Sequence, residues 1–234
     1  LIDYLALQVR KAGVDVHLGT EATATTVARL APDVVLVAAG GVHDVPDIPG
    51  IDGSNVVTGR SLHAQVKRLL RFAGPMTLRR LSALPIARDV VIGKRVVIMG
   101  GHLHGCQTAE FLLEQGKKVT VVDTGSEEEI GRGLLEVFLK PYLLYWLKDH
   151  GVEFVTDVTY QRVTRQGLVV ATADGTERLL AADTVVTALP LLPNLAATAA
   201  MAGTAAEVRT IGDALDPRLI VDAIAAGATV AREI

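Results

Sequence analysis

The stretch KRVVIMGGHLHGCQTAEFLLEQGKKVTVVD, Lys94 to Asp123, decides the fold of this chain. It opens with an apolar run, Lys94 to Met99, whose composition is typical of a strand buried on both faces. Glycines interrupt that run, and apolar residues then recur at helical spacing from Leu103 to Gln115. A second apolar run, Lys118 to Val122, predicts another strand. The stretch is therefore predicted to form a strand, a helix and a parallel strand.

The turn between this strand and this helix has the spacing of a dinucleotide-binding loop. In a G-x-G-x-x-G loop the first glycine permits the tight turn, and the third lets helix and strand approach closely. Gly100 and Gly105 hold these places, whereas His102 stands where a second glycine would meet the pyrophosphate. Either the His102 side chain fills space near the pyrophosphate, or its imidazole donates to a phosphate oxygen. The helix N-terminus still offers free N–H groups to a phosphate.

Asp123 stands at the end of the second strand. A carboxylate in that place accepts hydrogen bonds from ribose hydroxyls and repels a 2′-phosphate. The sequence therefore favours NAD(H) over NADP(H) as the nucleotide. The alternative is a Rossmann-like unit whose pocket holds ADP or stays empty.

The rest of the chain has the order of elements expected of an α/β protein with a parallel sheet. Before the dinucleotide loop we expect a helix ended by Gly13, a short strand over Val14–Leu18 and a strand buried on both faces over Asp33–Ala39. After it we expect a helix from Gly133 to His150. The other predicted elements are a strand, a three-strand antiparallel meander, two further strands and a last helix: Val152–Thr156, Tyr160–Val163, Leu168–Ala171, Glu177–Leu180, Thr184–Ala188, Val208–Ile211 and Pro217–Glu233.

The composition is that of an ordinary globular protein. The chain has 234 residues, of which 50% are hydrophobic and 21% are charged, so a sizeable core is expected. The formal net charge of −3 gives no reason to expect nucleic acid or an anionic membrane surface as a partner. The longest apolar stretch, Leu179 to Gly203, contains Asp183 and prolines that would be costly in a bilayer, so no membrane span is expected.

The single cysteine, Cys106, excludes an intramolecular disulfide and a cysteine-rich metal site within this chain. It favours a reducing, cytoplasmic setting, and we interpret it as a small buried packing residue. His102, His104 and Cys106 stand at alternate positions. Because the helix that begins near Leu103 scatters their side chains, we expect no metal site.

Two charged segments are interpreted as surface. Glu127–Glu129 is expected to be a solvated loop. A basic amphipathic helix is predicted over Ser61–Phe72, with Lys67, Arg68 and Arg71 on a solvated or interdomain face, and Gly74–Val91 is the best candidate for a linker.

Three segments together resemble the flavoproteins that have two dinucleotide-binding domains. VVIMGGHLHGCQTAEFLLEQGKKVTVVD, from Val96, is similar to their nicotinamide-binding insertion, and APDVVLVAAGGVHDVPDIPGIDG, from Ala31, is similar to the strand and loop that cross from the flavin domain. TIGDALDPRLIVDAIAAG, from Thr210, resembles their late Gly-Asp motif. The set is most similar to the C-terminal half of the NADH:flavin oxidoreductase, 2,4-dienoyl-CoA reductase and trimethylamine dehydrogenase family, over nearly the whole chain.

The resemblance implies the residues of two cofactor sites. Those that match the nicotinamide dinucleotide site are Gly100, Gly101, Leu103, Gly105 and Asp123, with His102 at the altered position. Those that match the flavin site are Gly40 and Gly41 at the crossing strand, Gly212 and Asp213 at the ribityl and pyrophosphate contact, and Ile220 and Ala223 beneath the isoalloxazine. No catalytic acid, base or nucleophile and no metal ligand is implied.

The resemblance also implies a domain organisation and an activity. Residues 1–92 and 204–234 are expected to form an incomplete FAD-binding domain, without its first βαβ unit, and 93–203 the inserted NAD(H)-binding domain. Family members carry an upstream barrel with FMN and a 4Fe–4S cluster, which would be the partner of this region. The chain is thus expected to be the electron-input region of a flavin-dependent reductase or dehydrogenase that passes hydride from NADH to FAD.

Other residues depart from the family pattern. Gln107 stands where related flavoproteins often have Glu, and Leu189-Pro190 stands where they often have a glycine-containing turn. Together with His102, Pro190 favours a second reading, in which the chain is a non-catalytic ADP-binding or structural and assembly domain.

Overall fold

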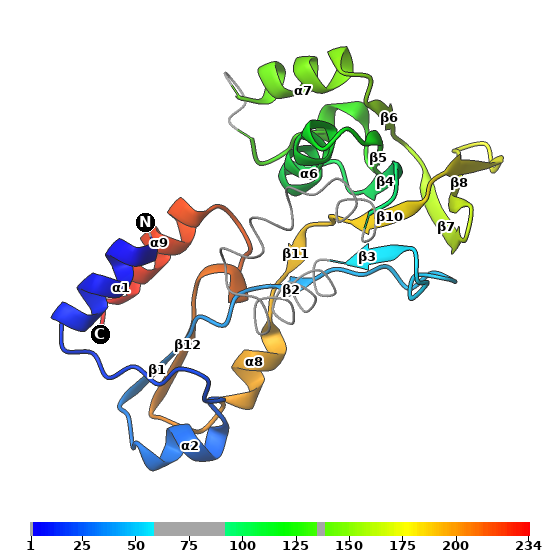
Figure 1. The fold of residues 1–234 in the computed structure, drawn as a ribbon. Helices are drawn as coiled ribbons and strands as arrows, with labels where there is room; N and C mark the ends of the chain where they lie inside the picture. The colour runs from blue at the N-terminus through cyan, green and yellow to red at the C-terminus, as the bar shows by residue number, and fades with distance from the viewer. Residues whose placement is uncertain (1, 59–91, 135–138) are drawn as a thin grey trace.

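The computed structural model describes residues 2–58, 92–134 and 139–234. These residues form an α/β fold in two parts, one built on a five-stranded parallel sheet and the other on a parallel pair of strands (Figure 1). The fold class expected from the sequence, a Rossmann-like parallel sheet with a small antiparallel meander, is confirmed. The basic helix and the linker predicted between 61 and 91 lie outside the described residues.

The larger sheet has the strand order β3-β10-β4-β5-β6, and all its neighbours are parallel. Its strands are β3 (Val56–Thr58), β10 (Thr184–Thr187), β4 (Arg95–Met99), β5 (Lys118–Val122) and β6 (Glu153–Val155). Helix α6 (Leu103–Glu114) connects β4 to β5, and α7 (Leu139–Asp149) leads from β5 to β6. The predicted strand–helix–strand unit is therefore confirmed within one residue at each boundary.

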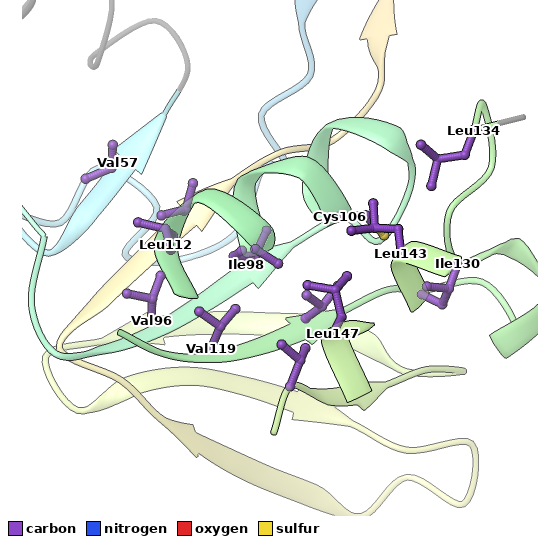
Figure 2. Packing of buried hydrophobic residues seen from close by; sticks show 14 residues of the cluster. Val57, Val96, Ile98, Cys106, Leu112, Val119, Ile130, Leu134, Leu143 and Leu147 are labelled. Carbon is purple, nitrogen blue, oxygen red and sulfur yellow. The ribbon is translucent and has the colours of Figure 1, made fainter. Parts of the chain in front are cut away.

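The two faces of this sheet carry two hydrophobic clusters. Successive residues of a strand point to opposite faces, and β4 shows this alternation directly. Val96 and Ile98 pack with α6 and α7 (Figure 2), whereas Val97 and Met99 pack with the antiparallel meander β7 (Thr159–Thr164), β8 (Gly167–Ala171) and β9 (Glu177–Ala181). Both pairs are almost fully buried, so β4 is a central strand that contributes to the core on both faces of the sheet.

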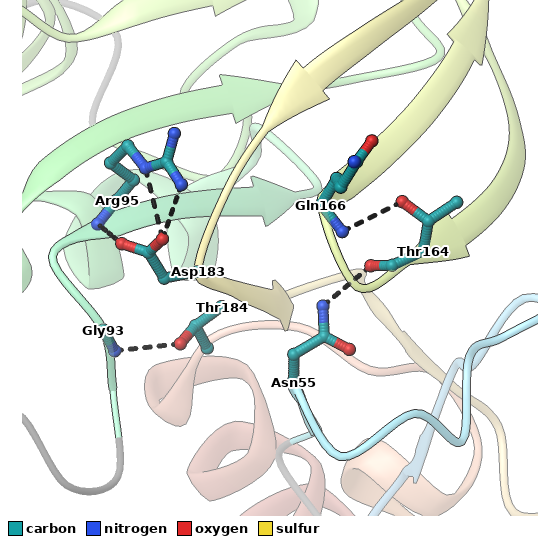
Figure 3. Close-up of polar contacts among 7 residues, drawn as sticks. All are labelled: Asn55, Gly93, Arg95, Thr164, Gln166, Asp183 and Thr184. Atoms are coloured by element: carbon teal, nitrogen blue, oxygen red, sulfur yellow. Dashed lines mark hydrogen bonds and ion pairs between the residues drawn. The ribbon is translucent and has the colours of Figure 1, made fainter.

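Polar contacts connect the sheet strands near their N-terminal ends, at the opposite end of the strands from the glycine loop (Figure 3). Asp183, just before β10, accepts hydrogen bonds from the backbone N–H of Arg95 at 2.9 Å and from its Nη2 at 2.6 Å. The Gly93 N–H donates to Thr184 Oγ1 at 2.9 Å. Asn55 Nδ2 donates to the Thr164 carbonyl oxygen at 2.9 Å, which ties the segment before β3 to the meander.

The second part is built on β1 (Val34–Val37), which pairs in parallel with β12 (Glu207–Thr210). Its other elements are the helices α1, α2, α8 and α9 and the short 3-10 helix η2: Ile2–Lys11, Ala24–Arg29, Leu195–Ala200, Ile220–Val230 and Gly212–Ala214. An antiparallel pair, β2 (Val42–His43) with β11 (Leu191–Leu192), lies between the two parts (Figure 1). Within the described ranges no helix combines the length and apolar character needed to cross a membrane.

Expectations for the N-terminal region were wrong in two places. Val14–Leu18 does not form a strand, because no strand of the described chain lies beside it to complete a hydrogen-bond ladder. The strand β1 is not buried on both faces, since Leu36 remains 36% exposed. In the described residues β1 has β12 as its single neighbour in the sheet, so its other edge has no strand beside it.

Two helices begin later than the sequence predicted. Gly131 at φ +75° and Gly133 at φ +93° are both in the left-handed region, and residues 131–134 are not helical. The described part of α7 is Leu139–Asp149. The last helix, α9, begins at Ile220 rather than Pro217, because Leu219 is extended and its N–H donates to Asp222 Oδ2 at 3.1 Å.

Candidate functional site

The glycine loop between β4 and α6 has no room for side chains at its first and third glycines. Gly100 has φ +104°, and a Cβ placed on it would lie 2.7 Å from the Ala188 carbonyl oxygen. A Cβ on Gly105 would overlap with the Gly100 carbonyl oxygen. The start of α6 therefore packs directly on the turn that ends β4, and both positions require glycine.

Asp123 is tied to this loop. It is only 7% exposed, and its Oδ2 accepts a hydrogen bond from the Gly101 N–H at 2.5 Å. Its Oδ1 accepts from the Gly125 N–H at 2.8 Å. Because both carboxylate oxygens already bond to loop amides, Asp123 holds the loop in place, and each oxygen keeps one further acceptor position.

The segment 131–133 lies alongside the glycine loop. The Gly131 N–H donates to the Gly101 carbonyl oxygen at 2.8 Å, and the Leu103 N–H donates to the Arg132 carbonyl oxygen at 2.9 Å. Within the described ranges the N–H groups of His104 and Gly105 donate to no protein atom. These two amides and the positive end of the α6 dipole are what this helix offers to an anion.

His102 is the residue that precedes α6. Its backbone has φ −70° and ψ −168°, a conformation open to any residue, so the fold does not require glycine there. The side chain makes no capping hydrogen bond. It lines the cavity described next, together with Leu103 and His104.

A cavity of about 340 Å³ lies between the start of α6 and the start of α9. Its titratable and charged lining residues are His102, His104, Arg132, Arg218 and Asp222. The remainder of the lining is mainly apolar, from Leu103, Pro190, Leu191, Pro217 and Leu219. Cations and imidazoles thus reach one cavity from three separate segments, a composition that suits an anionic ligand with an apolar part.

A second group of predicted residues gathers on the α9 side of the cavity. A Cβ on Gly41 would lie 3.0 Å from Leu191 Cβ and 3.3 Å from the Asp213 carbonyl oxygen, so these segments touch. Gly212 has φ +59°, and a Cβ on it would lie 3.6 Å from Ala223 Cβ. The Arg218 N–H donates to Asp213 Oδ1 at 3.3 Å.

Gly40 and Ile220 stand at the margin of this second group. Gly40 has φ +76°, and a Cβ there would meet nothing within 4 Å. Ile220, the first residue of α9, is 68% exposed. The structure therefore brings the predicted residues together as two groups, and the cavity lies between them.

Sequence reasoning missed the two arginines of the cavity. Arg132 Nη1 pairs with Glu129 Oε1 at 2.9 Å, and Arg218 Nε pairs with Asp216 Oδ2 at 2.7 Å. The glycines on either side of Arg132 were the available signal, because they let this segment follow the glycine loop closely. Arg218 lies within the segment that resembles the late Gly-Asp motif, but that resemblance implied no role for it.

Cys106 is a packing residue, as its place in the sequence suggested. It is fully buried in the cluster beneath α6, and its Sγ donates to the Gly101 carbonyl oxygen at 3.1 Å. Burial raises the pKa of the thiol to about 11. In the described part of the chain no group of three or more His, Cys, Asp or Glu residues is placed to hold a metal ion.

Comparison with known families and curated proteins supports a nucleotide-binding site. The family described as Pyridine nucleotide-disulphide oxidoreductase matches residues 6–212. An NADH oxidase of Thermoanaerobacter brockii is 29% identical over 99% of this chain and 32% of its own length. A bilirubin reductase of Mediterraneibacter gnavus is 30% identical over 90% of this chain and 28% of its own length.

Solved structures agree with these sequence relatives. A 2-naphthoyl-CoA reductase is 29% identical, with a TM-score of 0.77 over 100% of this chain and 32% of that chain. A histamine dehydrogenase from Rhizobium has a TM-score of 0.74 at 19% identity, over 100% of this chain and 35% of that one, and shows the fold alone. The chain therefore spans about a third of the length of these proteins.

Proposed function

Because the chain belongs to the Pyridine nucleotide-disulphide oxidoreductase family, we propose that it is the NAD(H)-binding electron-input region of a flavin-dependent oxidoreductase. In this proposal the whole protein is an NAD(P)H-dependent reductase or dehydrogenase that passes hydride from NADH to FAD. The cavity between the starts of α6 and α9 is the observation that carries it. His102 and Leu103 of the first group line this cavity. It reaches the second group through Leu191, which lies beside Gly41, and through Arg218, whose N–H donates to Asp213.

The α6 side of the cavity would hold the nicotinamide dinucleotide. Gly100 and Gly105 let α6 approach the loop, so the free amides of His104 and Gly105 face the pyrophosphate together with the helix dipole. Arg132 adds a positive charge beside these amides, and His102 adds an imidazole. Gly101 and Leu103 shape the loop, and Asp123 fixes it by accepting the Gly101 N–H.

The α9 side would hold part of FAD. Gly40, Gly41, Gly212 and Asp213 would accommodate the flavin's ribityl and pyrophosphate portion, and Ile220 and Ala223 would lie beneath its ring. The left-handed glycine at 212 and the close contact of Gly41 with the Asp213 carbonyl oxygen support this assignment. When bound, the two cofactors supply the hydride chemistry, and the protein's role is to orient them and exclude water.

We also propose a division of this chain into two domains and its membership of a narrower family. We assign residues 1–92 and 204–234 to an incomplete FAD-binding domain and 93–203 to the NAD(H)-binding domain, although β3, before residue 93, joins the larger sheet. The likeness to an NADH oxidase and a 2-naphthoyl-CoA reductase supports the NADH:flavin oxidoreductase, 2,4-dienoyl-CoA reductase and trimethylamine dehydrogenase family. An upstream barrel with FMN and a 4Fe–4S cluster would then be the partner of this region, in the cytoplasm.

A second candidate function is ADP binding without hydride transfer. His102 and Pro190 both line the cavity, on the path that joins the two groups of residues. If their side chains block the nicotinamide half, the α6 side could still hold an adenine nucleotide. The chain would then serve structure or assembly.

Calorimetric titration of the purified chain with NADH, NADPH and ADP separates the two functions. We expect NADH to bind, and Arg132→Gln to weaken its binding, whereas Arg165→Gln on the exposed turn of the meander leaves it unchanged. Binding of ADP without binding of NADH would overturn hydride transfer and support the second function.

A further inference from the structure

We propose that Glu129, rather than Asp123, determines the preference of this site for NAD(H) over NADP(H). The inference rests on the proposed function, since it concerns which nicotinamide nucleotide the same site accepts. It also changes the interpretation of Glu127–Glu129, which the sequence alone presented as a solvated loop.

Asp123 is poorly placed to discriminate against a 2′-phosphate. It is 7% exposed, and its two oxygens accept hydrogen bonds from the Gly101 and Gly125 amides. Because the Asp123 carboxylate is buried and already hydrogen-bonded to these two amides, it acts mainly to hold the glycine loop in place.

A second carboxylate, that of Glu129, lies beside Gly125 at the end of β5. A Cβ on Gly125 would overlap with Glu129 Oε2 and would lie 3.2 Å from Asp123 Oδ1, so both acids flank Gly125. The Glu129 side chain is 34% exposed. Of the two carboxylates at the end of β5, Glu129 is thus the one that solvent and a ligand can reach.

The end of β5 is where the adenosine ribose is expected in a strand–helix–strand dinucleotide unit. A 2′-phosphate carries close to two negative charges at neutral pH, whereas a 2′-hydroxyl carries none. The Glu129 carboxylate would therefore repel NADP(H) at this point and leave NAD(H) unaffected.

The partner of Glu129 adds a second consequence of losing the Glu129 charge. Glu129 Oε1 pairs with Arg132 Nη1 at 2.9 Å, and Arg132 also lines the cavity beside the glycine loop. While the pair is intact, each partner offsets only part of the other's charge, because both side chains are partly exposed. Loss of the Glu129 charge would remove the repulsion and also free Arg132 to attract a 2′-phosphate.

The neighbouring acid Glu128 provides a matched control. It lies on the same 3-10 turn, η1 (Glu127–Glu129), and is exposed. Glu127 is less suitable, because its Oε1 pairs with Lys148 Nζ at 2.7 Å. Glu128→Gln therefore removes the same charge from the same turn without touching Arg132.

The test measures the dissociation constants of NADH and NADPH for the full chain by calorimetry. We expect Glu129→Gln to reduce the preference for NADH about tenfold, mainly by tightening NADPH, and Glu128→Gln to change it less than about twofold. In the double variant Glu129→Gln with Arg132→Gln, part of the gain for NADPH should disappear. NADH affinity should persist in Glu129→Gln, which also reports that the variant is folded.

Three outcomes would overturn the inference. The first is an unchanged preference in Glu129→Gln, and the second is an equal change in Glu128→Gln. The third is a wild-type chain that binds NADPH as tightly as NADH, which would leave the proposed function standing. Failure of the wild-type chain to bind either nucleotide would instead overturn the proposed function, and the inference with it.

Discussion

The thiol of Cys106 and the carbonyl group of Gly101 are in direct contact, with Sγ donating to the oxygen at 3.1 Å. The Gly131 N–H donates to the same oxygen at 2.8 Å. Together with the Asp123 carboxylate on the Gly101 N–H, these bonds engage both polar groups of Gly101. The conformation of the glycine loop therefore depends on three residues, which come from α6, from the position directly after β5 and from the segment before α7.

Cys106 should resist alkylation in the folded protein. Burial raises its pKa to about 11, so at about pH 8 only about one thiol in a thousand is ionised, and the thiolate is the nucleophile. We expect mass spectrometry after iodoacetamide treatment to show no adduct on the native chain and complete modification after denaturation. Equal rates of modification in both states would contradict the buried position of Cys106.

Gly105→Ala should destabilise the fold and abolish NADH binding. The added Cβ overlaps with the Gly100 carbonyl oxygen, and forcing α6 away from the loop costs about 1–3 kcal/mol or more. Gly227→Ala in α9 is the control, since a Cβ there meets nothing within 4 Å and should stabilise the helix by about 0.5–1 kcal/mol. Urea unfolding of both variants measures the difference, and equal unfolding midpoints would argue against the close approach.

Asp123→Asn should lower the free energy of unfolding by about 1–3 kcal/mol. Asparagine keeps one acceptor oxygen, so either the Gly101 N–H or the Gly125 N–H loses its partner and faces an amide NH₂ group. The exposed Asp47→Asn makes the same chemical change without a buried contact and should be nearly neutral. A stable Asp123→Asn variant would show that the loop does not depend on this carboxylate.

Asp183→Asn should reduce stability at neutral pH and have little effect in strong acid. The hydrogen bond from the Arg95 side chain is the main reason that the pKa of Asp183 falls from 3.8 to about 2. The pKa of Asp183 is lower in the folded protein than in the unfolded chain. The ionised carboxylate therefore stabilises the fold above about pH 4, and this stabilisation is lost as the pH falls toward 2.

The pair is partly exposed, so the contribution should stay below about 1 kcal/mol. Urea midpoints of the wild type and Asp183→Asn at neutral pH and near pH 2 would test this. A difference that persists unchanged in acid would point to a cause other than the carboxylate charge.

Local sequence patterns predicted much of the fold. The strand–helix–strand unit from β4 to β5 was predicted closely, because glycines at the turn and apolar residues at strand and helix spacing are local signals. The three strands of the meander were predicted as well. The alternation in Val14–Leu18 was just as clear, yet it produced no strand, because a strand requires a neighbour that the segment itself cannot specify.

The sequence by itself determined the dinucleotide loop and placed Asp123 at its end, whereas the tertiary structure decided what surrounds them. In the folded chain Asp123 accepts a hydrogen bond from Gly101, and Glu129 lies beside Gly125. His102, Arg132 and Arg218 line one cavity. These arrangements arise from packing between segments far apart in the chain. A periodic pattern describes only the face that each segment buries, so it cannot state which distant residue will meet that face.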